Sequence, residues 1–161
     1  IVSTLTPYKK IDHAIRLFNK VNKKLVIIGD VPAKSSLETL AGENIDFLGF
    51  RSDKEVAEYL ENCQALIFPG EEDFGITPIE AMACGKPVLA FRKGGLLESG
   101  VEGETGEFFD ELTLPSMEDA LGRLLLNYKF YDSKRIRRRA EEFSEDRFKK
   151  EFEKFVAKVI K

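Results

Sequence analysis

Residues 66–91 read Leu66-Ile-Phe-Pro-Gly-Glu-Glu-Asp-Phe-Gly-Ile-Thr-Pro-Ile-Glu-Ala-Met-Ala-Cys-Gly-Lys-Pro-Val-Leu-Ala-Phe91, and this stretch decides the expected fold. Its apolar start predicts a strand at Ala65–Pro69, and its apolar end predicts another at Val88–Phe91. Between them, Pro78–Cys84 has the pattern of a helix that Gly85 closes. Strands that are apolar on both faces and separated by a helix are typical of parallel sheets covered by helices.

The same alternation of apolar strands and amphipathic helices continues on both sides of this stretch. Further strands are predicted at Ile1–Leu5, Lys24–Gly29, Ile45–Gly49 and Gly106–Phe109. Further helices are predicted at Ile11–Val21, Ala33–Leu40 and Lys54–Asn62, with two or three more in the remainder. Right-handed crossovers then give an α/β fold, a doubly wound parallel sheet with helices on both faces that is similar to a Rossmann fold. Because 161 residues fit one domain, residues 1–161 are expected to form a single domain.

Ligands of such sheets bind beyond the carboxyl ends of the strands, so the loops that follow the strands are the expected place for a site. These loops are Thr6–Lys10, Asp30–Pro32, Phe50–Asp53, Gly70–Gly75 and Arg92–Gly95. The turn after the first strand contains no glycine, whereas a dinucleotide-binding enzyme carries G-x-G-x-x-G there. The sequence therefore argues against NAD binding, and it contains no P-loop or nucleophile elbow either.

Composition argues against several other classes of protein. Apolar residues make up 43% and charged residues 33%, as in ordinary globular proteins, and the apolar runs are far too short to cross a bilayer. His13 has no partner at metal-ligand spacing, so no metal site is expected. Cys63 and Cys84 are expected to be small buried residues in a reducing, cytoplasmic setting. The basic run Lys134–Arg139 lacks interleaved aromatic residues, so nucleic acid is not an expected partner.

The loop between the two central strands has the chemistry of a site for a phosphate and a polyol. Free backbone N–H groups at a helix start, beside Gly75, suit a diphosphate, and Lys9 and Lys10 in the first loop can neutralise one. The acids Glu71–Asp73 suit sugar hydroxyls, because a carboxylate can accept two hydrogen bonds at once. Ordinary alternatives stay open. The lysines can be solvated, the acids can form a solubilising loop tip, and Thr77–Glu80 can be a helix capping box.

Taken together, residues 68–90 resemble the signature of the GT4 family of retaining glycosyltransferases, also called glycosyl transferases group 1. The family's E-x7-E pair falls on Glu72 and Glu80. Four other family landmarks agree in order and spacing, namely a phosphate loop, the third strand, a glycine loop and a late strand. They fall on Pro7–Asp12, Phe47–Gly49, Gly94–Glu98 and Gly106–Phe109. The resemblance covers nearly the whole chain and implies the C-terminal, nucleotide-sugar-binding half of the two-domain GT-B fold, without the N-terminal acceptor domain.

The resemblance implies roles for individual residues. Glu72 would be the catalytic residue, facing the donor sugar near the reacting carbon, and Glu80 would bind the ribose hydroxyls. Lys9 would neutralise the leaving phosphate, and Arg51 would stack on the base. The expected donor-binding set is completed by Lys10, Phe74, Gly75, Ile76 and Thr77.

One residue departs from the family pattern. Thr4 stands where the family usually has Arg, so one of two customary phosphate-neutralising cations is missing. Lys10 lies six positions further on and is a poor copy of a positioned guanidinium fork. Weaker donor binding, or positive charge from elsewhere, is therefore expected.

The reaction that the resemblance implies is transfer of a glycosyl unit, with retention, from a nucleoside diphosphate sugar to a glycan or lipid-linked acceptor. The run Glu71–Glu80 together with Pro7–Lys9 looks most like mannosyltransferase-type members, so GDP-mannose is the expected donor. No cofactor is expected, because the donor is a substrate. Since the acceptor mostly meets the N-terminal domain, the isolated chain is expected to be inactive, and the whole enzyme is expected in the cytoplasm or at the inner membrane face. Two alternatives stay open, a non-catalytic nucleotide- or sugar-binding module and a GT-B epimerase or glycogen-synthase-like enzyme.

Overall fold

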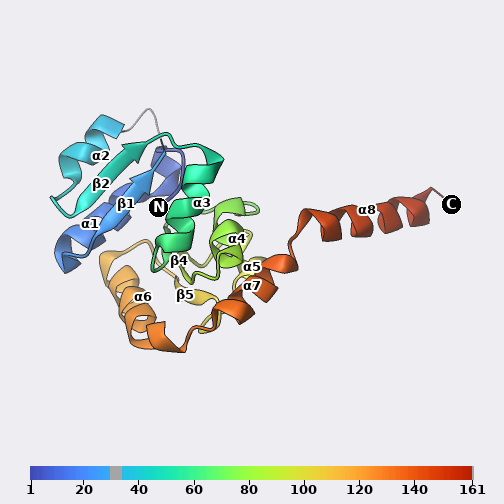
Figure 1. The fold of residues 1–161 in the computed structure, drawn as a ribbon. Coiled ribbons are helices and arrows are strands. Elements are labelled where there is room, and N and C mark those ends of the chain that lie inside the picture. Colours follow the sequence, from blue (N-terminus) through green and yellow to red (C-terminus); the bar gives the residue numbers. More distant parts are fainter. Residues whose placement is uncertain (30–33, 161) are drawn as a thin grey trace.

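The computed structural model describes residues 1–29 and 34–160 of the chain. The five strands in this part are β1 (Leu25–Ile28), β2 (Ile45–Gly49), β3 (Leu66–Phe68), β4 (Val88–Phe91) and β5 (Gly106–Phe109). The α-helices are α1 (Ile11–Val21), α2 (Lys34–Leu40), α3 (Asp53–Asn62), α4 (Ile76–Ala83), α5 (Leu96–Ser99), α6 (Leu114–Asn127), α7 (Ser133–Glu141) and α8 (Glu145–Val159). Two short 3-10 helices complete the list, η1 (Pro7–Lys9) and η2 (Tyr128–Phe130). Figure 1 shows their arrangement. The predicted loop Asp30–Pro32 and the first residue of a predicted helix, Ala33, lie outside the described residues.

Strands and helices alternate, and every strand pair is parallel. Among the described residues the hydrogen-bonded strands form two groups, β1-β2 and β3-β4-β5. Parallel neighbouring strands need a crossover connection, usually a helix, and helices lie between the successive strands. The predicted α/β class with parallel strands and flanking helices is confirmed.

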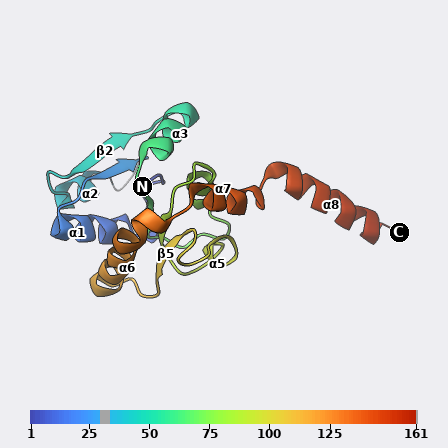
Figure 2. The ribbon, with the colours of Figure 1, turned by 60° about the horizontal axis from the view of Figure 1, so that its bottom comes forward.

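Both faces of the strands β3, β4 and β5 are buried, each against different helices. The side chains of Ile67, Leu89 and Phe109 belong to a core that α1 and α6 cover. The alternate side chains belong to a second core that α3, α4 and α7 cover, and they are Leu66, Phe68, Val88, Ala90 and Phe108. Figure 2 shows α1 and α3 on opposite sides of β1. Each fully buried Leu, Ile or Phe contributes about 1.5–3 kcal/mol, so the two-sided apolar strands account for much of the stability.

Two helix starts show how local sequence sets element boundaries. Ser52 caps α3 through a capping box with Glu55. By contrast, α4 begins at Ile76 with Gly75 as its N-cap, so the alternative of a capping box at Thr77–Glu80 is wrong. Gly75 has a φ of 79°, a conformation that glycine adopts without a steric penalty and that turns the chain into the helix.

The predicted strand Ile1–Leu5 is much shorter in the structure. Val2 forms an isolated parallel bridge with Ile28, and Ser3 donates a 3.0 Å hydrogen bond to the carbonyl oxygen of Ile28. The chain then turns, because the N–H of Thr6 bonds back to the carbonyl oxygen of Thr4. This turn brings the loop before α1 to the carboxyl edge of the strands.

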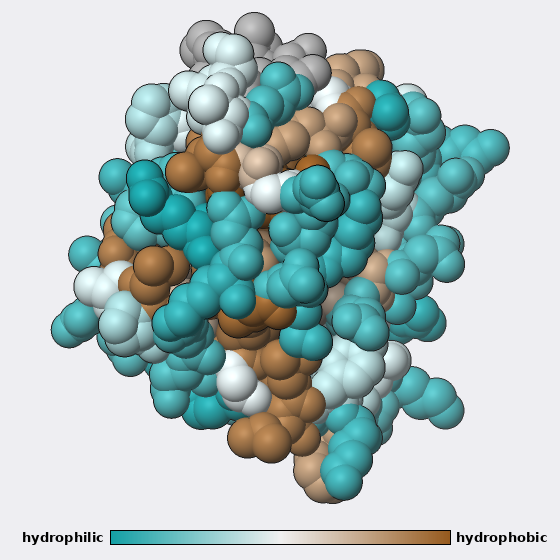
Figure 3. Space-filling model, turned by 90° about the vertical axis from the view of Figure 1, so that its left-hand side faces the viewer, coloured by the Kyte–Doolittle hydropathy of each residue, from teal (hydrophilic) through white to brown (hydrophobic). Residues whose placement is uncertain are grey.

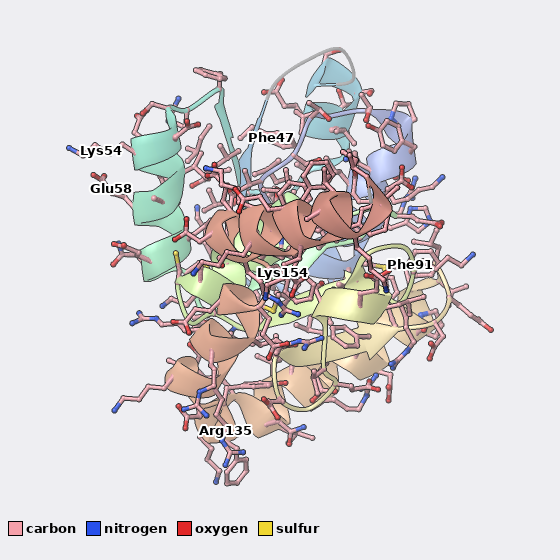
Figure 4. All side chains as sticks on the ribbon, turned by 90° about the vertical axis from the view of Figure 1, so that its right-hand side faces the viewer. Phe47, Lys54, Glu58, Phe91, Arg135 and Lys154 are labelled. Carbon is pink, nitrogen blue, oxygen red and sulfur yellow. The ribbon has the colours of Figure 1, made fainter. Side chains whose placement is uncertain are left out.

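The last two helices leave the body of the molecule. In Figures 1 and 2, α7 packs at the edge of the domain and α8 projects away from it. α8 contains no buried residue, and Phe148, Phe152 and Phe155 on it are exposed. Arg135 of α7 also points outward in Figure 4, so the basic run Lys134–Arg139 is largely a solvated helix face. α8 therefore adds little to the core.

The flank that carries α1, α2 and α6 is mostly hydrophilic. Figure 3 shows teal side chains over most of this surface, with brown atoms gathered toward its lower half, where α6 lies in Figure 1. Two exposed apolar side chains of α6, Leu125 and Leu126, belong to this region of the fold. Among the described residues, no helix is long and apolar enough to cross a membrane.

Candidate functional site

An open pocket of about 440 Å³ lies at the carboxyl edge of the strands, where the sequence predicts a ligand site. It is built from two loops that are far apart in the sequence, the loop before α1 and the loop between β3 and α4. Its lining residues are Val2, Ser3, Thr4, Lys9, Phe68, Glu72, Asp73, Phe74, Gly75, Ile76 and Thr77.

Lys9 and Glu72 form an ion pair across this pocket. Only 13% of the Lys9 side chain and 28% of the Glu72 side chain are exposed. Glu72 Oε1 is shielded from solvent, and it makes no hydrogen bond to another described residue besides this pair. The Lys9 ammonium also lies 4.9 Å from the centre of the Tyr8 ring. The cation expected at a phosphate and the acid expected at a sugar are thus direct partners.

The backbone on both sides of this pair is tightly placed. A Cβ atom added to Gly70 would lie 2.9 Å from the Cα atom of Lys9, so the absence of a side chain lets the two loops touch. Gly94 and Gly95 press on the other side, and Gly95 donates a 2.8 Å hydrogen bond to the carbonyl oxygen of Glu72. The glycines at 70, 94 and 95 therefore fix the position of the loop between β3 and α4 that carries Glu71–Asp73, here called the acid loop.

The amino end of α4 opens into the pocket. Gly75, Ile76 and Thr77 all line it, and no side chain caps the helix. The first backbone N–H groups of a helix have no partner within the helix, and the helix dipole makes this end partially positive. These groups can therefore bind an anion such as a phosphate.

Glu80 lies one turn further along α4, in an adjoining groove of about 410 Å³. Its side chain is exposed and forms no hydrogen bond or ion pair with another described residue. The groove and the pocket share Phe74 and Ile76. The groove is lined by Phe74, Ile76, Ile79, Glu80, Ala83, Arg137, Ala140, Glu141, Phe143 and Ser144. The two acids of the E-x7-E pair thus serve two connected hollows.

Two predicted residues lie outside the lining of both hollows. Lys10 is the N-cap of α1, with a left-handed φ of 56°. Arg51 donates a 2.8 Å hydrogen bond to the carbonyl oxygen of Phe50 and lies 3.7 Å from the Glu55 carboxylate. A donor contact by Lys10 or Arg51 stays a prediction. Lys9 is the one basic residue among the described residues that line the pocket, so nothing in the lining replaces the Arg missing at Thr4.

Sequence reasoning missed several lining residues. Ser3 lies within the predicted strand Ile1–Leu5, and Asp73 belongs to the acid run Glu71–Asp73 but was not assigned to the donor-binding set. Arg137 and Phe143 come from α7 and the turn after it, about 60 residues from α4 in sequence, and no local motif marks them. Phe143 reaches the site through an edge-on ring contact with Phe74 at 6.4 Å between ring centres.

A larger hollow lies at the opposite edge of the strands. It measures about 630 Å³ and is lined mainly by apolar side chains, among them Phe18, Leu25 and Leu121. It opens at the amino end of β1, and ligands of parallel sheets bind at the carboxyl ends, so we assign the functional site to the smaller pocket. Among the described residues, no cluster of His, Cys, Asp and Glu is arranged to hold a metal ion.

Comparison with known proteins agrees with the architecture. The family model of glycosyl transferases group 1 matches residues 1–143. The chain belongs to this family. Within the family, it is 30% identical over 131 residues to an uncharacterized glycosyltransferase of Methanocaldococcus jannaschii, covering 78% of this chain and 37% of that protein.

One further relative and one solved structure are similar to this chain. A GDP-mannose-dependent alpha-(1-6)-phosphatidylinositol dimannoside mannosyltransferase of Mycobacterium tuberculosis is 41% identical over 81 residues, covering 48% of this chain and 21% of that protein. The solved structure of Anabaena HepE in complex with UDP has the same fold, with a TM-score of 0.85 and 20% identity over 98% of this chain and 48% of that chain. The chain spans less than half the length of each of these three proteins. It has the architecture of one half of a GT-B glycosyltransferase.

Proposed function

We propose that this chain binds the nucleoside diphosphate sugar of a retaining glycosyltransferase and acts within a longer polypeptide. One observation carries the proposal. A lysine, two carboxylates and the uncapped amino end of α4 meet in a single pocket at the carboxyl edge of the strands. N–H donors suit a diphosphate and carboxylates suit sugar hydroxyls, so the pocket matches both parts of a nucleotide sugar.

The residues divide the donor between them. The N–H groups of Ile76 and Thr77 bind the diphosphate at the amino end of α4. Glu80, one turn along the same helix, accepts hydrogen bonds from the two ribose hydroxyls in the adjoining groove. Because Glu80 is exposed and has no partner among the described residues, it is available for this role.

The proposed reaction exchanges one bond for another at the anomeric carbon. The bond from that carbon to the diphosphate oxygen breaks, and a bond to an acceptor hydroxyl oxygen forms on the same face. The hydroxyl proton is released, and the diphosphate leaves with the bonding electron pair. Positive charge on Lys9 and at the start of α4 stabilises the leaving diphosphate, and Glu72 stabilises positive charge that develops on the sugar.

For the donor we propose GDP-mannose, with a glycan or lipid-linked acceptor bound by the N-terminal domain of the same polypeptide. The name of the Mycobacterium tuberculosis relative supports this choice of donor. UDP-sugars are the alternative donors, because the structurally similar HepE was solved in complex with UDP. A titration with GDP, UDP and ADP, each free and sugar-linked, separates these possibilities by the order of their affinities.

The decisive experiment compares Glu80→Ala with wild type by calorimetric titration of the preferred nucleotide. Loss of a hydrogen bond to a charged group should weaken binding about 10-fold or more, because such bonds contribute about 1.5–3 kcal/mol. The melting temperature should stay unchanged, because Glu80 caps nothing. Glu58→Ala is the matched control, since Glu58 is an exposed helix residue that points away from the body in Figure 4. Failure of every nucleotide to bind wild type would refute the proposal.

A non-catalytic binding module is the second candidate, and Thr4 favours it, because a pocket with one basic residue stabilises a departing diphosphate less well. Turnover of a labelled donor by the longer polypeptide decides between the two. A glycosyltransferase should lose turnover in Glu72→Ala while retaining donor binding, and it should keep turnover in the presence of a metal chelator. A binding module should show no turnover in any form.

A further inference from the structure

The side chains that line the pocket carry a net negative charge, which does not favour binding of the proposed anionic ligand. One lysine, Lys9, faces two acids, Glu72 and Asp73, which gives a net charge of −1 (one positive, two negative) for the described lining residues. A nucleoside diphosphate is itself an anion. Lys9 is already paired with Glu72, so in the free protein it is not available to the phosphates.

The backbones of both partners are held in place. The backbone of Lys9 packs against Gly70, which leaves no room for a side chain at position 70. The backbone of Glu72 is held by Gly94 and Gly95, through a hydrogen bond to its carbonyl oxygen and through direct contact. With both backbones held, the pair can separate by rotation of the two side chains about their own bonds, and rotation of Glu72 carries its carboxylate away from the ammonium without moving either loop.

We propose that the Glu72 carboxylate competes with the donor's diphosphate for Lys9. In the free protein, Glu72 occupies the position beside Lys9 that the diphosphate takes when the donor binds. The donor's diphosphate takes over Lys9, and the displaced Glu72 carboxylate then turns toward the sugar. The free protein thus keeps its phosphate site neutralised, and the acid reaches its working position after the phosphate has bound. This inference rests on the proposed function, because it concerns the same donor site.

Competition makes a prediction opposite to that of a simple ligand contact. If Glu72 competes with phosphate, Glu72→Gln should bind a free nucleoside diphosphate more tightly than wild type. The gain should be about 5-fold, the equivalent of one partly exposed ion pair. The corresponding nucleoside without phosphates should bind equally to both proteins.

Asp73→Asn is the matched control. It removes the same unit of negative charge from the same pocket, but Asp73 is not the partner of Lys9. A smaller gain in nucleotide affinity in Asp73→Asn than in Glu72→Gln supports competition. Equal gains would mean that the overall charge of the pocket explains the effect, and they would overturn the inference. The gain of Glu72→Gln should also vanish in a Lys9→Ala background, as a double-mutant cycle requires for a direct pair.

The experiment is calorimetric titration of GDP and UDP into the wild-type protein, Glu72→Gln, Asp73→Asn, Lys9→Ala and the Lys9→Ala/Glu72→Gln double variant, with melting temperatures to confirm folding. If wild type binds neither nucleotide, the proposed function fails and the inference fails with it. If wild type binds and Glu72→Gln binds equally or more weakly, the inference alone is overturned. A crystal structure of wild type with bound nucleoside diphosphate needs no variant. The Glu72 carboxylate should have left the Lys9 ammonium, and an intact pair would overturn the inference.

Discussion

The backbone N–H of Gly95 donates a 2.8 Å hydrogen bond to the carbonyl oxygen of Glu72, so the loop after β4 holds the acid loop after β3. The contact is close because Gly95 has no side chain. A Cβ atom there would lie 2.3 Å from the carbonyl oxygen of Phe74 and 2.6 Å from that of Asp73. The two loops form one unit, and the position of Glu72 depends on a residue 23 positions away.

Replacing Gly95 by Ala should therefore disturb the site by steric contact alone. Gly95 has a φ of −61°, which alanine adopts freely, so backbone strain is not part of the effect. We expect a loss of about 1–3 kcal/mol in the free energy of unfolding and weaker nucleotide binding, as for other overpacked positions. Gly122→Ala is the control. The added methyl group meets no atom within 4 Å and lies in the helix α6, so stability should stay equal or rise. Unchanged binding in Gly95→Ala would show that the contact does not position the acid loop.

Arg123, whose side chain is 35% exposed, pairs with the buried carboxylate of Glu107. Glu107 is 2% exposed and accepts hydrogen bonds from Arg123 Nη1 at 2.5 Å, Asn127 Nδ2 at 2.9 Å and the Tyr131 hydroxyl at 3.0 Å. Burial, with the nearby Glu107 carboxylate, raises the pKa of the Tyr131 hydroxyl. We expect Arg123→Ala to cost about 3 kcal/mol in urea unfolding, because it leaves a buried carboxylate without its cation.

The control for this prediction is an exposed pair of the same kind. Arg147 pairs with Glu151 on the surface of α8, with about half of each side chain exposed. Arg147→Ala should change the free energy of unfolding by no more than about 0.5 kcal/mol. Similar losses in the two variants would mean that burial of Glu107 does not decide the cost.

The capping box of α3 should make stability depend on pH. Hydrogen bonds from the Ser52 hydroxyl and the Ser52 backbone N–H lower the pKa of Glu55 below its usual value. A carboxyl whose pKa is lower in the folded state stabilises the fold above its unfolded pKa, and this contribution disappears as the pH falls through the folded pKa. Glu55→Ala should therefore lower the melting temperature at pH 7, and the difference should shrink toward about pH 3. Glu58 lies in the same helix but takes no part in the capping box, so the effect of Glu58→Ala on the melting temperature should not depend on pH in this way.

Removal of α8 should leave the domain folded. No residue of Glu145–Val159 is buried, so deleting the helix removes little apolar contact with the core. The melting temperature of a chain ending at Ser144 should match that of the full chain. In contrast, Ile136→Ala in α7 should cost about 2–5 kcal/mol, because Ile136 is fully buried. A marked loss of stability on deleting α8 would mean that the helix packs against the domain in solution.

The pattern of apolar residues predicted most elements to within a few residues. Strands β3 and β4 could be read from short runs such as Val88–Phe91, because every side chain in them is buried on one face or the other. The start of α4 was misplaced. Thr77 and Pro78 carry a strong local signal for a helix start, but the N-cap is the left-handed Gly75, two residues before Thr77. The short helix α5 was missed, since four residues give no measurable periodicity.

The sequence by itself determined the class of fold, the edge of the sheet where a ligand is expected and the spacing of Glu72 and Glu80. These depend on local periodicity and on the order of elements along the chain. Only the tertiary structure decided that Lys9 pairs with Glu72, that Arg51 faces Glu55, and that Glu80 shares a groove with Arg137. Such contacts join residues far apart in the chain or depend on side-chain packing, and no local propensity specifies which of several available charges a lysine or an acid will meet.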